Sequence, residues 1–128
     1  MRDIDNKADI EALMKAFYAK AIYDGVIGHY FTEVVVLNLE KHLPVICNFW
    51  DSVVFNQTGY QGNVMQVHQH LHCLSAFTSE HFKQWVFLFK QTVDEHFEGD
   101  NSEKIKQRAE SIATVMNIKL VHSGIGVK

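Results

Sequence analysis

Histidine is the residue type that most strongly suggests chemistry in this sequence, with 8 among 128 residues. His68, His70 and His72 follow one another closely on a single expected helix. His68 and His72 are spaced i and i+4, so they share one helix face and could clamp a zinc or another transition-metal ion. Such a site needs a third protein ligand, and none stands at an obvious spacing. The sequence also lacks HExxH and paired ExxH segments, which mark helical metalloproteases and di-iron bundles.

A haem site needs fewer protein ligands than a zinc site, because one ligand and a large apolar slot between helices suffice. The 12% aromatic content supplies residues for such a slot. Tyr18 and Trp85 lie on the apolar faces of their expected helices, a pattern that by itself favours core packing. Each also carries a polar donor that must find a partner when buried, and a bound anionic diatomic ligand requires such donors. The pattern leaves both interpretations of Tyr18 and Trp85 open.

The spacing of apolar residues predicts the helices that position these side chains. An amphipathic helix is expected over residues 7–23, with Asn6 as its N-cap and Gly25 available to end it. A second helix is expected to carry Pro44 in its first turn, since proline lacks an N–H group that would find no partner there. This arrangement places His42 at or just before the start of that helix.

Three more helices complete the expected set. One is predicted roughly over residues 63–74 and carries the closely spaced histidines. The next begins at a cap formed by Thr78 or Ser79, and the last is capped by residues 99–102 and continues to about Leu120. The sequence therefore predicts one all-α domain over residues 1–128, built from about five main helices.

Composition and charge exclude several classes of protein. A single proline and 7 glycines are too few for the many turns of an all-β domain. A formal net charge of −3 lacks the basic footprint of a nucleic-acid-binding protein. The longest apolar runs are far shorter than the roughly 20 residues of a membrane-spanning helix. The polar, acidic start is unlike a signal peptide, so a cytoplasmic protein is expected.

Several segments, taken in order, resemble those of the group III truncated haemoglobins, a family of small bacterial globins. The resemblance covers about residues 10–120, and the motifs are specific in combination. They are Phe17-Tyr18, Ile27-Gly28 leading to Phe31, the segment 40–44 before Asn48-Phe49-Trp50, Tyr60-Gln61-Gly62-Asn63, His81-Phe82-Lys83-Gln84-Trp85, and Arg108-Ala109 with Ile112-Ala113. Two positions depart from the family pattern: Leu39 stands where tryptophan is frequent, and Val64 stands where proline is frequent.

The resemblance implies a shortened globin fold, with helices packed two over two around a haem b group. His68 matches the histidine that binds the iron, while Tyr18 and Trp85 match the residues that donate hydrogen bonds to the ligand. His42 matches a histidine at the ligand gate, where it either stays or swings inward to bind the iron. The remaining residues expected to line the haem pocket are Phe31, Ile46, Phe49, Trp50, Tyr60, Met65, Phe82, Val86 and Phe89.

The function that the resemblance implies is the binding of O₂, NO, CO or peroxide at an iron with an open position. Two hydrogen-bond donors retain O₂ longer than a carrier requires, so redox chemistry or ligand sensing is expected rather than bulk transport. Peroxide reduction and NO oxidation are the enzymatic alternatives, and both would draw electrons from a reductase partner. The rival hypothesis is a non-haem helical bundle that binds zinc through His68 and His72, or that acts as an interaction module.

Overall fold

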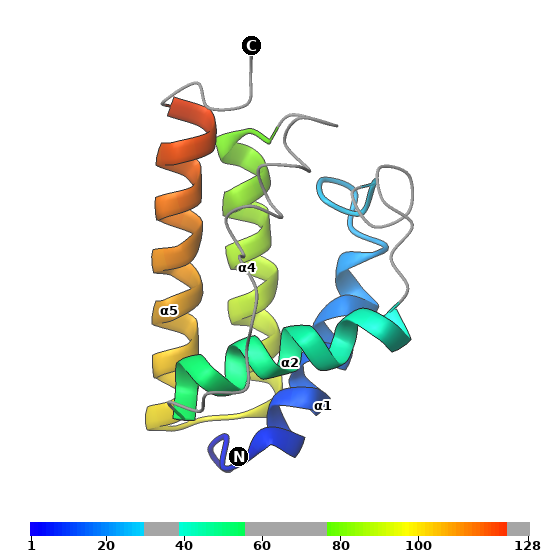
Figure 1. Ribbon diagram of the computed structural model, residues 1–128, viewed down its shortest axis with the longest axis vertical. Helices are drawn as coiled ribbons and strands as arrows, with labels where there is room; N and C mark the ends of the chain where they lie inside the picture. Colours follow the sequence, from blue (N-terminus) through cyan, green and yellow to red (C-terminus); the bar gives the residue numbers. More distant parts are fainter. Residues whose placement is uncertain (30–38, 56–76, 123–128) are drawn as a thin grey trace.

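A computed structural model describes residues 1–29, 39–55 and 77–122 of the chain, with residues 39–42 and 121–122 described by their backbone alone. These ranges are helical and contain no strand (Figure 1). The elements are α1 (Lys7–Ala21), α2 (Leu39–Phe55), α4 (Ser79–His96), α5 (Asp100–Met116) and the π-helix η2 (Asn117–His122). The expected helix over residues 63–74 lies outside the described residues.

The helices pack as two pairs. α4 and α5 stand side by side, while α1 packs against α2, which crosses in front of the other helices (Figure 1). α1 also contacts α4, and α2 contacts α5, so the two pairs share one apolar core. Among the largest fully buried side chains of that core are Ile4, Ile10, Leu13, Met14, Phe17, Phe89, Val93 and Ile105. The expectation of an all-α, two-over-two arrangement is confirmed.

α1 begins where the sequence predicts and ends slightly earlier. The Asn6 side chain accepts a hydrogen bond from the Asp9 amide at 3.0 Å, which satisfies one of the unpaired donors at the helix start. The helix ends at Ala21 with Ile22 as its C-cap, so Gly25 does not end it. The chain turns over residues 22–28 instead, with Asp24 supplying the local hydrogen bonds that hold the turn.

α2 begins earlier than the sequence predicts. The expectation that Pro44 occupies the first turn is wrong, because the helix starts at Leu39 and encloses the proline. His42 therefore lies within the helix rather than at its start. A proline there removes the bond to the carbonyl of Glu40 and costs about 3 kcal/mol. Packing of the helix against the core offsets that cost, since Cys47 and Trp50 are buried and Leu43 packs beside them.

α4 has a local cap at its start. Thr78 is the N-cap, and its hydroxyl accepts from the His81 amide while the His81 Nδ1 accepts from the Thr78 amide at 3.0 Å. This is a capping box in which histidine replaces the usual glutamate or glutamine. The expected cap at Thr78 or Ser79 is confirmed.

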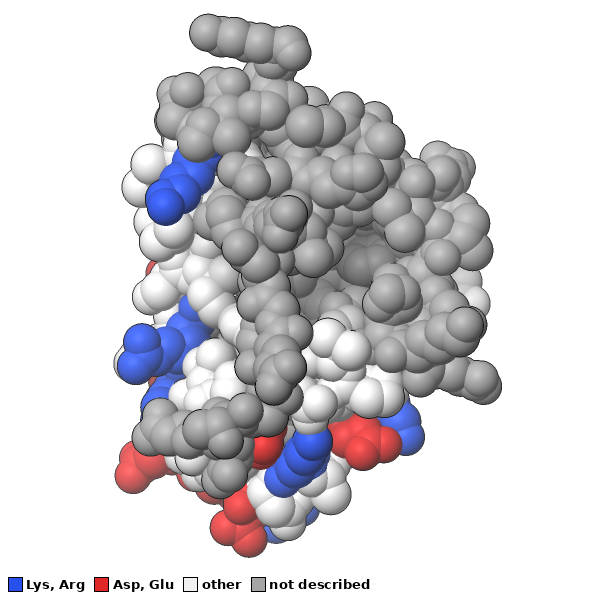
Figure 2. Space-filling model, viewed as in Figure 1, with Lys and Arg blue, Asp and Glu red and all other residues white. Residues whose placement is uncertain are grey.

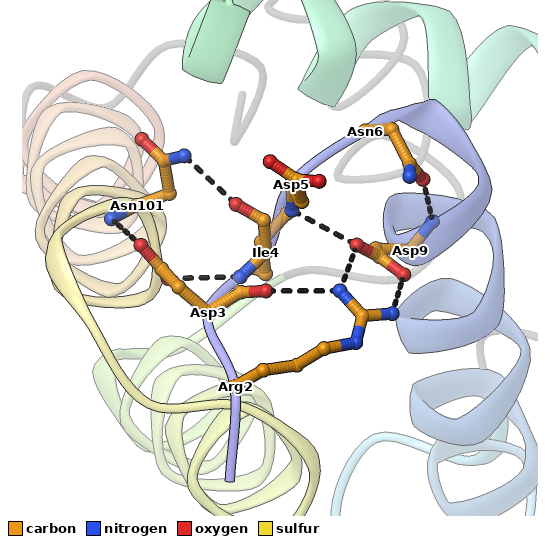
Figure 3. A network of polar contacts seen from close by, with 7 residues as sticks. All are labelled: Arg2, Asp3, Ile4, Asp5, Asn6, Asp9 and Asn101. Atoms are coloured by element: carbon orange, nitrogen blue, oxygen red, sulfur yellow. Dashed lines mark hydrogen bonds and ion pairs between the residues drawn. The ribbon is translucent and has the colours of Figure 1, made fainter.

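α5 is capped from the other end of the chain. Gly99 precedes the helix and has no side chain to cap it, so the expectation of a local cap is wrong. The Asp3 carboxylate accepts from the amides of Asn101 at 2.9 Å and Ser102 at 2.8 Å, and from the Ser102 hydroxyl at 2.7 Å. Figure 3 shows the bond from the Asn101 amide. These bonds join residues almost a hundred positions apart, so spacing along the sequence does not reveal them.

The cap belongs to a wider polar network, which we call the N-terminal clasp: Arg2, Asp3, Ile4, Asp9, Asn101 and Ser102. Figure 3 shows all of these residues except Ser102. Both terminal nitrogens of the Arg2 guanidinium donate to the Asp9 carboxylate, one of them at 2.7 Å. The Asn101 side chain donates to the Ile4 carbonyl at 2.8 Å, and Ile4 is itself buried. The clasp thereby attaches the first residues of the chain to α1 and α5 together.

Charges of both signs lie close together on the face shown in Figure 2, along α5 and near the N-terminus. Lys106 pairs with both Asp94 and Glu103 at 2.6 Å, and Lys90 pairs with Glu110 at 2.6 Å. Exposed pairs of this kind contribute little stability each. None of the described helices is both long enough and apolar enough to span a membrane.

Candidate functional site

An aromatic cluster of Phe17, Tyr18, Trp50, Trp85 and Phe89 lies where α1, α2 and α4 meet. The Phe17 ring is its hub, with its centre 5.2 Å from that of Tyr18, 6.1 Å from Trp85 and 5.4 Å from Phe89. All three contacts are edge-on, an arrangement that the charge distribution of aromatic rings favours. The structure thus brings Tyr18 and Trp85, which come from different helices, against the same side chain.

Face-to-face stacking holds the rest of the cluster. Trp85 stacks on Phe89 at 5.3 Å with an interplanar angle of 25°, and Phe89 stacks on Trp50 at 5.0 Å and 30°. Phe89 is 1% exposed and Trp50 is 5% exposed, so both rings are part of the core. Trp85 is only partly buried, which places its ring at the edge of the packed region.

The Tyr18 hydroxyl stays protonated at any physiological pH. Burial raises the pKa of Tyr18 above its ordinary value of 10.0, and the neighbouring Cys47 thiol adds a smaller electrostatic contribution. Burial also raises the pKa of Cys47 to about 11. Because both groups remain neutral, the Tyr18 hydroxyl is a hydrogen-bond donor in an apolar environment.

The Trp85 indole N–H donates to no protein acceptor among the described residues, and the Trp85 ring contacts those of Phe17 and Phe89 there. An indole N–H is a donor that usually finds a partner when it is buried. Trp50 also lacks an acceptor among the described residues, but it is enclosed in the core. Trp85 combines an unused donor with a partly accessible position, as a ligand-binding side chain requires.

The structure divides the other expected pocket residues between two places. Phe82 and Val86 pack with Met116 and Leu120 in a second apolar cluster on the side of α5 and η2. Ile46 and Phe49 are partly buried against the main core. Trp85 packs against the main core and against the second cluster, so it lies between these two groups of residues. The expected roles of these side chains in cofactor binding remain predictions.

Five of the expected site residues cannot be placed by their side chains. His42 is described by its backbone alone, within α2. Phe31, Tyr60, Met65 and His68 lie outside the described residues. Within the described ranges, no three His, Cys, Asp or Glu side chains gather so that they could hold a metal ion.

Sequence reasoning missed one polar contact beside Trp85. The side chain of Gln84 donates from Nε2 to the Asp24 carboxylate at 2.7 Å, which ties α4 to the turn after α1. The sequence does indicate that Asp24 lies in a turn, because aspartate before a glycine often caps a turn. No sequence pattern links that aspartate to a glutamine 60 positions later.

A pair of imidazoles also joins these segments. The ring centres of His29 and His81 are 5.7 Å apart. Burial lowers the pKa of His81, and the proximity of His29 lowers it further, against a smaller opposite influence of Glu80. His81 is therefore held in its neutral form, as its role as an acceptor in the α4 capping box requires.

The described side chains of the aromatic cluster are of the types that a haem pocket requires. Tyr18 supplies a protonated hydroxyl and Trp85 an unused N–H, from two helices that meet at Phe17. Phe17 packs against both side chains and Phe89 against Trp85, and the slot for a flat apolar cofactor requires such aromatic walls. Such a pocket needs one further residue, the iron ligand, and the resemblance implies His68 for this role, a position outside the described residues.

The chain is similar to truncated haemoglobins of Campylobacter jejuni along most of its length. It is 29% identical over 112 residues to the group 3 truncated haemoglobin Ctb of Campylobacter jejuni, which covers 85% of this chain and 86% of that protein. The crystal structure of a group III truncated haemoglobin from Campylobacter jejuni matches the fold with a TM-score of 0.81 and 26% identity, covering 94% of this chain and 95% of that one. No protein-family model matches the chain.

Proposed function

From its confirmed similarity in sequence and fold to the group III truncated haemoglobins, we propose that this chain is a haem b protein that binds O₂ and other diatomic gases. His68 is the proposed iron ligand, and Tyr18 and Trp85 are the proposed donors to the bound gas. His42 gates the pocket or binds the iron from the gas side. The observation that carries the proposal is the meeting of Tyr18 and Trp85 at Phe17.

Haem supplies an iron that binds diatomic gases and shifts electron density onto them. The role of the chain is to stabilise the resulting partial negative charge. The Tyr18 hydroxyl remains a donor because burial raises its pKa, and the Trp85 N–H has no competing acceptor among the described residues. Hydrogen bonds to a charged partner are about twice as strong as those between neutral groups.

The aromatic surroundings strengthen this effect. Phe17 and Phe89 pack against Trp85 and exclude water from that side of the indole. A donor that is kept from water interacts more strongly with a charged ligand than one in bulk solvent. Two such donors slow the release of O₂ and polarise it. This favours peroxide reduction, NO oxidation or sensing over transport, with a reductase as the electron donor for the redox reactions.

The first test is the visible spectrum of protein produced with an adequate haem supply. The proposal expects an intense band near the blue edge and about one haem b per chain. His68→Ala should lose most of the haem, whereas His70→Ala and His72→Ala should retain it. A colourless protein that refuses added haemin, or that binds zinc instead, would overturn the proposal. Haem loss in His72→Ala alone would move the iron ligand by one helical turn.

The second test addresses the donors. Tyr18→Phe keeps the ring and removes one hydrogen bond to a charged ligand, worth about 1.5–3 kcal/mol. O₂ should therefore leave about 10 to 100 times faster, while CO release changes much less because CO carries less negative charge. Trp85→Phe should act in the same direction, and the two effects should not add. Stopped-flow dissociation rates of both gases measure this.

The matched control is Tyr23→Phe. Tyr23 lies five residues after Tyr18 and is 84% exposed, so removing its hydroxyl should leave both gas release rates unchanged. If Tyr18→Phe leaves O₂ release unaltered, or changes O₂ and CO equally, then Tyr18 is a core aromatic and not a donor to the ligand.

A further inference from the structure

Asp24 is the centre of a tightly built turn at the end of α1. One carboxylate oxygen accepts from the amides of Val26 at 2.9 Å and Ile27 at 3.0 Å. The Asp24 carbonyl accepts from the Gly28 amide at 2.9 Å. The side chain therefore holds the three residues that follow it in one fixed conformation, as aspartate does in other turns of this type.

Close packing at Gly28 makes the turn rigid. A Cβ atom at this position would lie 2.5 Å from the Asp24 carbonyl oxygen and 2.8 Å from that of Ile22. Both obstacles are backbone atoms, which cannot move aside as the end of a side chain can. Gly28 thus lies tightly against the carbonyls of the turn itself. The turn follows directly on the last turn of α1, where the Ile22 amide donates to the Tyr18 carbonyl.

Gln84 attaches α4 to this segment. Its Nε2 donates to the second oxygen of the Asp24 carboxylate at 2.7 Å. Burial raises the pKa of Asp24, but hydrogen bonds from the Ile27 amide, Gln84 and the Val26 amide lower it by more, so the group is ionised. The contact is a charge-assisted hydrogen bond in a partly buried position, stronger than one between neutral groups.

The location of this bond matters because Trp85 is the next residue. Trp85 is otherwise held by an edge contact with Phe17 and by stacking on Phe89, which lies on its own helix. Aromatic contacts tolerate small sliding movements, whereas a hydrogen bond weakens steeply as its geometry changes. Two polar contacts join α4 to the α1 segment: the Lys20–Glu95 ion pair, near the far end of α4, and the Asp24–Gln84 bond, directly beside Trp85. The Asp24–Gln84 bond is therefore the one placed to set how far along α1 the Trp85 donor lies.

We infer that Asp24 and Gln84 are positioning residues that fix the Trp85 N–H relative to the Tyr18 hydroxyl. This inference rests on the proposed function, because it concerns the placement of the two proposed donors. Neither Asp24 nor Gln84 touches the ligand. They act by holding α4 in register with α1, so that both donors reach the same bound gas.

The test exchanges the two groups. Gln84→Glu places two carboxylates against each other at pH 8, where both are ionised, and pushes α4 away from the turn. The double variant Asp24→Asn with Gln84→Glu restores the bond with donor and acceptor reversed. Asp24→Asn alone should have little effect, because the Gln84 amide can rotate and accept from the new amide. Gln91→Glu, at an exposed position of the same helix, is the control for added charge.

Two measurements are made on the haem-loaded protein. Gln84→Glu should speed O₂ release about threefold to tenfold, equivalent to about 0.6–1.4 kcal/mol, with little change for CO, and the double variant should reverse this. The sequence holds 2 tryptophans, so the CO-bound form gives two indole N–H signals in NMR. The Trp85 signal, assigned with Trp85→Phe, should shift in Gln84→Glu and return in the double variant. The Trp50 signal should stay in place.

The outcomes separate this inference from the proposed function. If Trp85→Phe and Tyr18→Phe leave O₂ release unchanged, the donor role fails and the positioning role fails with it. If both accelerate O₂ release but Gln84→Glu does not, or if the double variant fails to restore the rate, the positioning role alone is wrong. Equal shifts of both indole signals would indicate general loosening and also contradict it. If Gln84→Glu does not fold, Gln84→Met removes the bond without adding charge and should speed O₂ release less, in the same direction.

Discussion

The N-terminal clasp and the aromatic cluster both attach α1 to the other helix pair, but with opposite kinds of contact. In the clasp, every carboxylate oxygen of Asp3 and Asp9 accepts at least one hydrogen bond. In the aromatic cluster, ring contacts provide the attachment, and the Trp85 N–H has no acceptor among the described residues. A saturated polar network stabilises the fold, whereas an unused donor in an apolar site is available to a ligand.

The ionisable groups of the two regions also differ: those of the clasp are charged and Tyr18 of the aromatic cluster is neutral. The hydrogen bond from Arg2 is the largest influence that lowers the pKa of Asp9 against the effect of burial, followed by the bond from the Asp5 amide and the charge of Arg2. Burial raises the pKa of Asp3, but bonds from Ser102, Asn101 and Ile4 lower it by more. Around Tyr18 the dominant effect is burial alone, which keeps the group neutral. The clasp thus stabilises the ionised carboxylates of Asp3 and Asp9. The neutral donors of the aromatic cluster are suited to stabilise the partial negative charge of a bound ligand.

The largest expected effect breaks the clasp. Asp3→Ala removes the cap of α5 and leaves the buried Ser102 hydroxyl without its acceptor, which together should cost about 2–4 kcal/mol of unfolding free energy. Urea denaturation measures the loss. Asp3→Asn keeps one acceptor oxygen and should cost less. O₂ release should remain unchanged in both variants, and a large change in that rate would show that the two regions are not separate.

A second variant disturbs the clasp through the backbone. Gly99 has a φ of +147°, and a Cβ there would lie 2.5 Å from the Asp3 Cγ atom. Gly99→Ala should therefore strain the backbone and displace the capping carboxylate, at a cost of about 1–3 kcal/mol. Gly25→Ala is the matched control, because a Cβ at position 25 has no atom within 4 Å. A Gly99→Ala protein as stable as the control would contradict this account of the clasp.

The α4 capping box and the N-terminal clasp should lose their stabilising effect at different pH, because the first titrates through His81 and the second through Asp3 and Asp9. The pKa of His81 is lowered in the fold below its ordinary value of 6.5, so the unfolded chain binds the proton more readily. The stability from this capping box is complete above about pH 6.5 and is lost as pH falls through the lowered pKa. His81→Gln keeps an acceptor for the Thr78 amide without titrating. It should flatten the stability profile between pH 7 and 5, and an unchanged slope would refute this.

The clasp carboxylates should lose their contribution at lower pH. The pKa values of Asp3 and Asp9 are both lowered from 3.8, so their stabilisation is present above about pH 4 and disappears as pH falls through the lowered values. Denaturation curves of Asp3→Asn and the unmodified protein should therefore converge at the acidic end. Curves that stay parallel down to the acid transition would mean that Asp3 does not titrate in the clasp.

The smallest expected effect on stability lies in the cluster. Tyr18→Phe removes one hydroxyl from an aromatic contact and should change the unfolding free energy by about 1 kcal/mol or less. The same variant is expected to have a large effect on O₂ release. Asp3→Ala should show the reverse combination. A Tyr18→Phe protein that is destabilised as strongly as Asp3→Ala would show that the hydroxyl serves the fold rather than a ligand.

The sequence by itself determined the local features of this protein. Apolar spacing placed Phe17, Tyr18, Trp85 and Phe89 on inward helix faces, because the helical period decides which side chains share a face. The caps at Asn6 and Thr78 follow from side chains that accept from amides three residues away. The resemblance to the group III truncated haemoglobins was also legible in the order of short motifs.

Tertiary structure alone decided three features. It extended α2 across Pro44, because packing against the core offsets a lost backbone bond that a local rule counts in full. It selected Asp3 as the cap of α5 and Asp24 as the partner of Gln84, from many equally suitable side chains. These bonds span 98 and 60 positions, and sequence periodicity carries no information on which distant residues meet. Only the packing of the helices brings those donors and acceptors within bonding distance.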